Sequence, residues 1–200
     1  MQVSARGELT SLCKVMAKDG VSIVARDVQL DKIIGVAFNK IQIKGNPDEP
    51  SEYFMFRKQN TNSDHGKMLL KIMMEIDQSI DCYEYFETDC IFDLSFLCTI
   101  PGYARKSVGK MLTFYSVELA RELKNGKSLN LLPEHLRSSN PVPGAITAVF
   151  SSNYSQKIGF DLGFETLSKW SFADFEFKGK QLSERITGGH ETMILVGLRL

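Results

Sequence analysis

The first half of the chain changes from β-like to helical hydrophobic spacing. Two runs rich in β-branched residues, 21–28 and 32–43, are separated by a short polar turn and predict a β-hairpin. Residues 44–64 are polar, with turn formers early in the stretch, and predict a loop. Beyond it, apolar positions recur at helical spacing, so we expect a helix with Ser63 or Asp64 as its N-cap.

The second half predicts alternating strands and helices. Residues 90–100 form a bulky apolar run, which predicts a strand buried on both faces, and a helical stripe follows over 108–123. Turn formers in 127–143 separate this helix from an apolar strand at 145–150. A short serine-capped helix that stops at Gly163 comes next. The chain then closes with two further strands, 166–177 and 192–200.

This order of elements predicts an α/β fold with a mixed, mostly antiparallel central sheet flanked by helices. A strand that leads directly into a helix and then into another strand makes a parallel crossover. Ligands of such sheets bind where the carboxyl ends of neighbouring parallel strands part. We therefore expect residues 99–110 and 150–157 to surround one cleft.

Composition limits the classes of protein and partner. With 200 residues, of which 43% are hydrophobic and 24% charged, the chain is expected to form one domain over 1–200. Its formal charge of +0 argues against a nucleic-acid partner, and no apolar run approaches the roughly 18 residues of a membrane span. We expect a soluble monomer with a small-molecule partner.

Cysteine and histidine usage narrows the expectation further. Four cysteines occur without a Cys-x-x-Cys pair, and the N-terminus lacks the apolar core of a signal peptide. These features indicate a cytoplasmic protein with reduced thiols. His65, His135 and His190 lie far apart in polar contexts, so we expect no metal site.

The stretch PGYARKSVGKML joins the apolar strand of the second half to the helix that follows. A helix N-terminus has free N–H groups and about half a positive charge, so small residues there let an anion approach the backbone. Ser107 and Gly109 are small, and Arg105, Lys106 and Lys110 are cations that reach further phosphates. The spacing favours a pyrophosphate site, but a capped, solvated helix start with ordinary surface cations explains it equally.

The same stretch resembles the acyl-CoA loop of the GNAT acetyltransferase superfamily, whose pattern is arginine or glutamine, two residues of any kind, glycine, any residue, and glycine or alanine. Ala104 stands in the first position, Ser107 in the first glycine position and Gly109 in the last. The resemblance implies acetyl-CoA as cosubstrate and a bulge at Cys98–Ile100 that aims backbone N–H groups at the thioester oxygen. It assigns acetyl-CoA binding to Cys98, Thr99, Ile100, Arg105, Lys106, Ser107, Val108, Gly109, Lys110 and Lys157.

The C-terminal half resembles a narrower group, the insect arylalkylamine N-acetyltransferases. Residues 151–175, SSNYSQKIGFDLGFETLSKWSFADF, contain that subfamily's serine pair, Tyr-Ser, Leu-Gly-Phe and Phe-Ala-Asp in order. The resemblance covers about residues 10–200. It implies that Ser151 and Ser155 belong to a catalytic relay, while Ser152 caps the short helix. The alternative is that these serines only cap.

The chain departs from the resembled families at two positions, one that holds a catalytic base and one that holds a catalytic acid. The subfamily's base is a glutamate in an Asp-Glu-Pro-Leu segment of its first helix, ahead of the hairpin, where this chain has only some twenty residues. We therefore expect the family's first strand and helix to be absent, and Glu49, which follows the hairpin, does not inherit the role. Other GNAT enzymes have a tyrosine acid where Gly159 stands, and Tyr154 lies about 140° away around a helix.

The resemblance as a whole implies a GNAT-fold enzyme with an acyl-CoA cleft between two parted parallel strands. Its expected activity is direct transfer of acetyl from acetyl-CoA to a small arylalkylamine such as dopamine, serotonin or tyramine, or to a polyamine. Two alternatives remain open. A peptide or protein amine as acceptor predicts an open groove, and a non-catalytic acyl-CoA-binding protein predicts no release of thiol.

Overall fold

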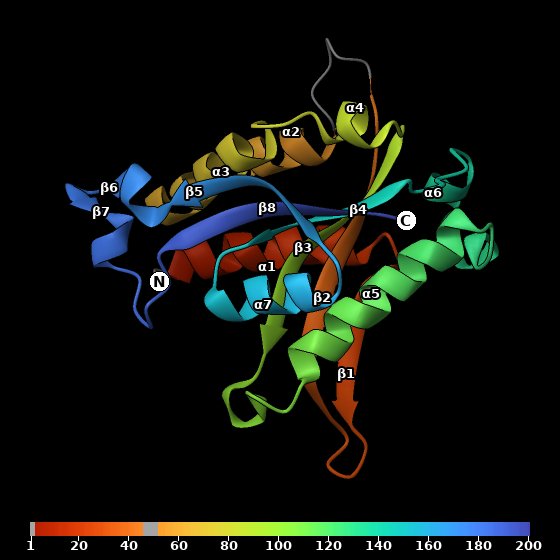
Figure 1. Cartoon of the computed structure of the whole chain (residues 1–200), viewed down its shortest axis with the longest axis horizontal. Helices are drawn as coiled ribbons and strands as arrows, with labels where there is room; N and C mark the ends of the chain where they lie inside the picture. Colours follow the sequence, from red (N-terminus) through yellow and green to blue (C-terminus); the bar gives the residue numbers. More distant parts are fainter. Residues whose placement is uncertain (1–2, 46–51) are drawn as a thin grey trace.

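The computed structural model describes residues 3–45 and 52–200, and at its centre lies a six-stranded sheet (Figure 1). Neighbouring strands are antiparallel except β3 and β4, which are parallel, so the predicted mixed sheet with a parallel crossover is confirmed. In spatial order the strands are β1 (Ile23–Asp27), β2 (Lys32–Ile43), β3 (Cys90–Thr99), β4 (Ala145–Phe150), β8 (Thr192–Arg199) and β5 (Glu165–Ser171).

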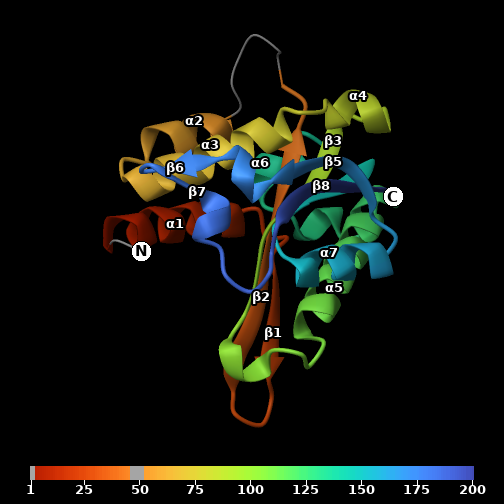
Figure 2. The same cartoon turned by 60° about the vertical axis from the view of Figure 1, so that its left-hand side comes forward.

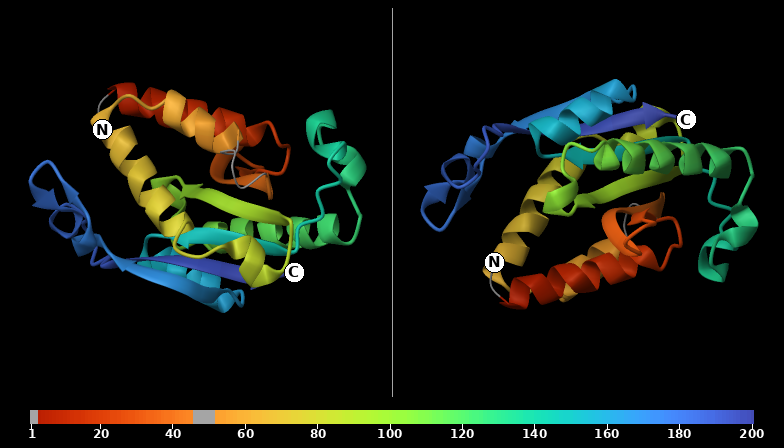
Figure 3. Two further views of the ribbon diagram at one scale, coloured as in Figure 1. Left: turned by 90° about the horizontal axis from the view of Figure 1, so that it is seen from above. Right: turned by 90° about the horizontal axis from the view of Figure 1, so that it is seen from below.

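Helices cover both faces of this sheet (Figure 3). On one face α5 (Val108–Lys124) packs across β2 and β3, and α7 (Asn153–Asp161) lies beside it. On the other face α1 (Val3–Ala17) packs on β2, and α3 (Asp64–Asp77) packs on β4 and β8. The other described elements are α2 (Glu52–Gln59), α4 (Cys82–Phe86), α6 (Glu134–Arg137) and the small hairpin of β6 (Glu176–Phe177) and β7 (Lys180–Gln181).

Two hydrophobic clusters hold the layers together. The larger one lies between the sheet and α5 and contains Phe92 of β3, Leu123 of α5 and Ile146 of β4, all fully buried. The smaller one lies under α3, where Ile76 meets Met193 of β8. Because full burial of such a side chain contributes about 1.5–3 kcal/mol, these contacts fix the ends of β3, β4 and α5 relative to one another.

The helices predicted from periodicity are confirmed, together with their caps. Ser63 is the N-cap of α3 and accepts a hydrogen bond from the Gly66 N–H. Ser152 is the N-cap of α7, and this helix ends just before Gly163, whose φ of 88° is the left-handed conformation that glycine adopts readily. Local sequence signals therefore placed these helix ends correctly.

Three elements differ from the prediction. The pattern predicted nothing ahead of residue 21, but α1 is there, and α2 lies inside the predicted loop 44–64. The strand expected over 166–177 ends at Ser171, where a turn of 3₁₀ helix replaces it. Glu49 lies outside the described residues, and the absence of the family's first strand and helix stays an expectation.

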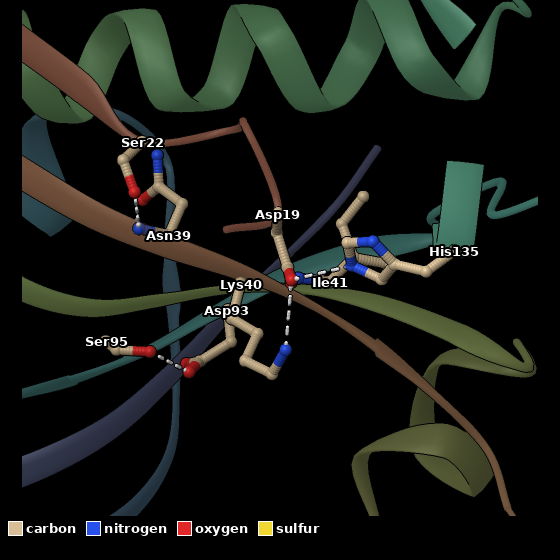
Figure 4. Close-up of polar contacts among 8 residues, drawn as sticks. All are labelled: Asp19, Ser22, Asn39, Lys40, Ile41, Asp93, Ser95 and His135. Carbon is tan, nitrogen blue, oxygen red and sulfur yellow. Dashed lines mark hydrogen bonds and ion pairs between the residues drawn. The ribbon is translucent and has the colours of Figure 1, made fainter. Parts of the chain in front are cut away.

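Helix α1 is held by buried apolar side chains such as Met16 and by polar contacts with distant parts of the chain. The Glu8 carboxylate accepts hydrogen bonds from the N–H groups of Asn62 and Ser63, which ties it to the start of α3. Just beyond the helix, Asp19 is only 2% exposed and receives the Lys40 ammonium at 3.0 Å and the Ile41 N–H at 3.1 Å (Figure 4). These long-range partners explain why the local pattern did not predict α1.

No helix within residues 3–45 and 52–200 is both long enough and apolar enough to cross a membrane.

Candidate functional site

The parallel strands β3 and β4 part before they end. They pair over four residues, the last pair being Leu94 and Ala148, whereas β3 continues to Thr99 and β4 to Phe150. A cavity of about 300 Å³ opens between the parted ends and is lined by residues of β3, β4, α5 and α7. We call it the fork cavity, and it lies where the sequence predicted a cleft.

Strand β3 is irregular where it enters the fork cavity. Two adjacent residues of β2, Phe38 and Asn39, face residues of β3 that are not adjacent, so Ser95 is an extra residue without a partner on β2. Such a β-bulge twists the strand and changes the direction of a side chain. The prediction of a bulge at Cys98–Ile100 is therefore wrong: the bulge lies at Ser95, which lines the fork cavity.

The end of β3 pairs regularly with β2, and this pairing decides which backbone groups face the cavity. The Ile100 N–H donates to the Ile34 carbonyl at 3.0 Å, so the alternation of an antiparallel ladder also directs the Cys98 N–H to β2. The N–H groups of Leu97 and Thr99 point the other way, toward the parted β4, and both residues line the cavity. Thr99 was predicted for this region, whereas Leu97 was not.

The loop between β3 and α5 presents further N–H groups at a helix start. Arg105 and Ser107 both have φ of 60°, and a left-handed residue other than glycine costs about 1–2 kcal/mol. The N–H groups of Val108 to Lys110 have no acceptor inside the helix, because the first intrahelical bond runs from Met111 to the Ser107 carbonyl at 2.9 Å. Backbone donors in such a turn form an anion site.

A side chain outside the resembled motif holds this loop in place. The Tyr103 hydroxyl donates to Asp27 Oδ2 at 2.6 Å, and this bond keeps the pKa of Asp27 below its usual value. Figure 2 shows the loop beside the end of the β1–β2 hairpin. Lys106 lies over the Tyr103 ring, with Nζ 4.7 Å from its centre. The hairpin thus positions the helix start.

The cations predicted for this site differ in their contacts with acidic residues. Lys110 and Lys157 both contact Asp161, with Nζ–Oδ distances of 3.2 and 3.0 Å, and these hydrogen bonds lower the pKa of Asp161. Arg105 is exposed. Asp161, which the sequence did not single out, therefore offsets part of the positive charge that the two lysines bring to the cavity mouth.

Three serines at the start of α7 line the fork cavity: Ser151, Ser152 and Ser155. Ser152 Oγ accepts the Ser155 N–H at 3.1 Å, and Ser155 Oγ accepts the Ser152 N–H at 3.2 Å, which completes a capping box. Their hydroxyl oxygens lie 2.9 Å apart. Capping by Ser152 is confirmed, Ser155 shares that role, and the relay role of Ser151 and Ser155 stays a prediction.

Aromatic residues lie over the same helix start. Tyr154 is 70% exposed and lines the cavity, and its ring lies 5.6 Å from the ring of His190. His190 Nδ1 accepts the Asn153 N–H at 3.2 Å, so this histidine is held at the start of α7. Across residues 3–45 and 52–200, no group of three His, Cys, Asp or Glu residues is arranged to hold a metal ion.

Acidic residues lie on the other side of the fork. A second cavity, of about 360 Å³, is lined by sheet residues, by the end of α3 and by the start of α4, and it contains the carboxyl groups of Asp77 and Asp93. We call it the acid cavity. Ser95 Oγ donates a short hydrogen bond to Asp93 Oδ2 (Figure 4). The sequence did not single out these residues, because Asp93 interrupts an apolar run that predicts only a buried strand.

Solved structures share this architecture. Arylalkylamine N-acetyltransferase 2 from Aedes aegypti superposes with a TM-score of 0.73 at 23% identity, over 96% of this chain and 78% of that one. A mosquito arylalkylamine N-acetyltransferase-like 5b protein gives 0.69 at 21% identity, over 90% and 75%. A Drosophila melanogaster polyamine N-acetyltransferase, described as forming N-acetylagmatine, gives 0.68 at 14% identity, over 94% and 79%.

Sequence comparison alone adds nothing to this result: no family model and no curated protein matches the chain. The structural likeness covers nearly the whole chain, as the resemblance over residues 10–200 implied. The parted parallel strands, the loop after β3 and the helix that follows it are the features that the superfamily resemblance led us to expect. The chain therefore has the GNAT fold of the insect arylalkylamine N-acetyltransferases.

Proposed function

We propose that this protein N-acetylates a small primary amine, with acetyl-CoA as cosubstrate. The fork cavity carries the proposal, because it combines backbone N–H donors from β3 and α5 with the hydroxyl groups of α7 around about 300 Å³. A site of this size suits a thioester and a small amine better than a folded protein surface. The GNAT fold, which all three structural relatives share, supports the same activity.

The residues of the fork cavity fit acetyl-CoA. Gly109 lines the cavity, and a Cβ atom on it would lie 3.4 Å from Ile158 and 4.0 Å from Thr99 Oγ1, so a side chain there would take up space that glycine leaves free. In our proposal the N–H groups of residues 108–110 bind the pyrophosphate, and those of Leu97 and Thr99 polarise the thioester carbonyl. In the same proposal Lys106, Lys110 and Lys157 contact the outer phosphate groups.

The transfer itself needs a neutral amine and a proton for the leaving sulfur. An alkylammonium has a pKa near 10.4, so its deprotonation at pH 7 costs roughly 4 kcal/mol unless a positioned base assists. The amine nitrogen then bonds to the carbonyl carbon, the carbon–sulfur bond breaks, and the proton that the nitrogen loses ends on the thiolate. Ser151 and Ser155 are the hydroxyl groups that we assign to this proton delivery.

The amine that we propose is an arylalkylamine such as dopamine, serotonin or tyramine, or a polyamine. Two structural relatives are named as arylalkylamine enzymes and one as a polyamine enzyme. The carboxyl groups of Asp77 and Asp93 beyond the fork support a cationic substrate in either case, because they favour an approaching ammonium group.

A panel assay tests the proposal. Acetyl-CoA is incubated with dopamine, serotonin, tyramine, agmatine, spermidine and a short peptide with a free N-terminus, and released thiol is measured. We expect turnover with at least one small amine and none with the peptide. Turnover with the peptide alone would point to a peptide acetyltransferase, and binding of acetyl-CoA without any thiol release would point to a non-catalytic protein; either result overturns the proposal.

A further inference from the structure

Asp93 and Ser95 connect the two cavities of the molecule. Ser95 is the bulged residue of β3 and lines the fork cavity, whereas Asp93, two residues earlier, lines the acid cavity. Figure 4 shows both side chains on the same side of β3, joined by the hydrogen bond from Ser95 Oγ to Asp93 Oδ2. A residue that lines the fork cavity is therefore hydrogen-bonded, through its hydroxyl, to a carboxyl group of the acid cavity.

The bulge makes this geometry specific. In a regular strand Ser95 would pair with β2, and the residues after it would keep their alternation, but the extra residue leaves Ser95 free of a β2 partner at the point where β4 has turned away. Leu94 is the last residue of β3 that pairs with β4. Ser95 is thus the first residue of β3 beyond the segment that pairs with β4, and it lines the fork cavity.

Charged and polar groups surround Asp93 from every neighbouring element. Burial raises the pKa of Asp93, and the Ser95 hydrogen bond, the Arg57 charge, the Gln42 hydrogen bond and the Lys40 charge oppose that rise in decreasing order. Burial and the charge of Asp93 raise the pKa of Asp77 as well, to about 7, against Arg57. The other titratable groups around this cavity are Asp81, Cys82 and Tyr83 at the start of α4.

We propose that Ser95 and Asp93 form the proton-accepting pair of the amine, in which the Ser95 hydroxyl meets the ammonium group in the fork cavity and passes a proton to Asp93. This inference rests on the proposed function and names the base that it lacks. One N–H proton of the ammonium moves to Ser95 Oγ while the Ser95 proton moves to the Asp93 carboxylate. The products are a neutral amine, an unchanged serine and a protonated Asp93.

The remaining steps balance without another reactant. The neutral amine nitrogen bonds to the thioester carbon, the carbon–sulfur bond breaks, and the second amine proton ends on the thiol through the α7 serines. Asp93 then loses its proton to water through the acid cavity, next to Asp77, whose side chain is 44% exposed. Because the aqueous exit is separate from the fork cavity, the proton leaves without crossing the bound thioester.

The test uses two amines that differ in basicity. Phenethylamine is almost wholly protonated at pH 7, with fewer than about one molecule in a thousand neutral, whereas its β,β-difluoro analogue is far less basic. For Asp93→Asn and Ser95→Ala we expect kcat/KM for phenethylamine at pH 7 to fall by about a hundredfold or more. The loss should shrink above pH 9, and the fluorinated amine should lose less than about fivefold, since it arrives neutral.

A second test uses the pH profile of kcat/KM for the single variant Asp77→Asn. This substitution removes a carboxyl group that interacts electrostatically with Asp93, so we expect the acidic limb of the kcat/KM profile to move to lower pH. A limb that stays in place or moves to higher pH would contradict the pair. If Asp93→Asn does not fold, Ser95→Ala still decides, since it removes no ionisable group from the cavity.

The outcomes separate this inference from the proposed function. Equal losses for both amines in folded variants would mean that the pair supports structure or binding only, and the inference would be overturned while the acetyltransferase activity stands. Wild-type rates in both variants would overturn it equally. If the wild-type protein binds acetyl-CoA but acetylates neither amine at any pH, the proposed function fails first, and the inference fails with it.

Discussion

The two sides of the fork present different kinds of chemical group. On the α5 side, the polar groups at the cavity are backbone N–H groups at the end of β3 and the start of α5, together with the serine hydroxyl groups of α7, and nearby cations such as Arg105 are exposed. On the α3 side, the groups are charged side chains that contact one another, such as Asp77 with Arg57, which is 5% exposed. One side relies on the path of the chain, and the other relies on the identity of its residues.

This difference decides how much substitution each side tolerates. Every residue except proline supplies the same N–H group, so we expect the loop to bind an anion even with Ala104 and Ser107 where the GNAT pattern has other residues. A buried carboxylate has no such substitute, because an uncompensated or missing charge in a low-dielectric region costs several kcal/mol. We therefore expect variants of the α5 side to act through shape and variants of the α3 side to act through charge.

The largest expected effect comes from a substitution that fills the space beside the backbone N–H groups of residues 108–110. Gly109→Asp places a carboxylate beside the N–H groups that we assign to the pyrophosphate, and should weaken CoA binding by about a hundredfold or more through repulsion and loss of space. Calorimetric titration with CoA measures it. Gly102→Asp is the control, because it adds the same charge to the same loop at a point where nothing lies within 4 Å of the new Cβ. Equal losses of CoA affinity in both variants would contradict a pyrophosphate site at these N–H groups.

The serines of α7 separate proton transfer from capping. Ser151→Ala and Ser155→Ala should lower kcat by about tenfold to a hundredfold, with little change in KM for acetyl-CoA. Ser152→Ala and Ser155→Ala should each lower the free energy of unfolding by about 1 kcal/mol, since each removes half of the capping box. Steady-state kinetics and urea unfolding give the two readouts. Unchanged kcat in all three variants would reduce the serines to caps.

Charge removal should matter more on the α3 side than at the cavity mouth. Arg57→Met deprives the Asp77 carboxylate of its cation, and after allowance for the 44% exposure of Asp77 we expect a loss of about 1–2 kcal/mol in the free energy of unfolding. Lys157→Met, whose partner pair is exposed, should change it by less than about 0.5 kcal/mol. A larger loss for Lys157→Met would reverse the comparison.

The effect of Arg57→Met should also depend on pH. The folded-state pKa of Asp77, about 7, lies above the unfolded value, so the folded protein binds more protons, and this contribution is full at low pH and is lost as pH rises through 7. Removal of Arg57 raises this pKa further. Urea unfolding should therefore show a larger loss for Arg57→Met at pH 8 than at pH 5, and the opposite order would contradict the role of Asp77.

The smallest expected effect tests the strained turn. Ser107 has φ of 60°, so Ser107→Gly should raise the free energy of unfolding by up to about 1 kcal/mol and leave CoA affinity unchanged or slightly higher. Ser128→Gly is the matched control, because Ser128 also has φ of 60° but lies away from the fork cavity. A loss of CoA affinity in Ser107→Gly alone would show that the serine side chain, and not the backbone, serves the anion site.

The sequence predicted the elements whose evidence is local. The spacing of apolar residues was enough for the hairpin, α3 and α5, and the serine cap with Gly163 was enough for α7, because caps and periodicity involve residues only a few positions apart. The two segments around the fork were also predicted, since a crossover between parallel strands places their carboxyl ends together. The α5 side of the site thus follows largely from the sequence.

The tertiary structure alone decided the α3 side. Helix α1 depends on partners such as Ser63 and Lys40, far along the chain, and the position of the bulge at Ser95 depends on how β2 pairs with β3. Asp77 and Asp93 stand sixteen positions apart and become a pair only when α3 packs against the sheet. Burial, register and the distance between charges are sums over long-range contacts, and no local pattern of hydrophobic and polar residues contains them.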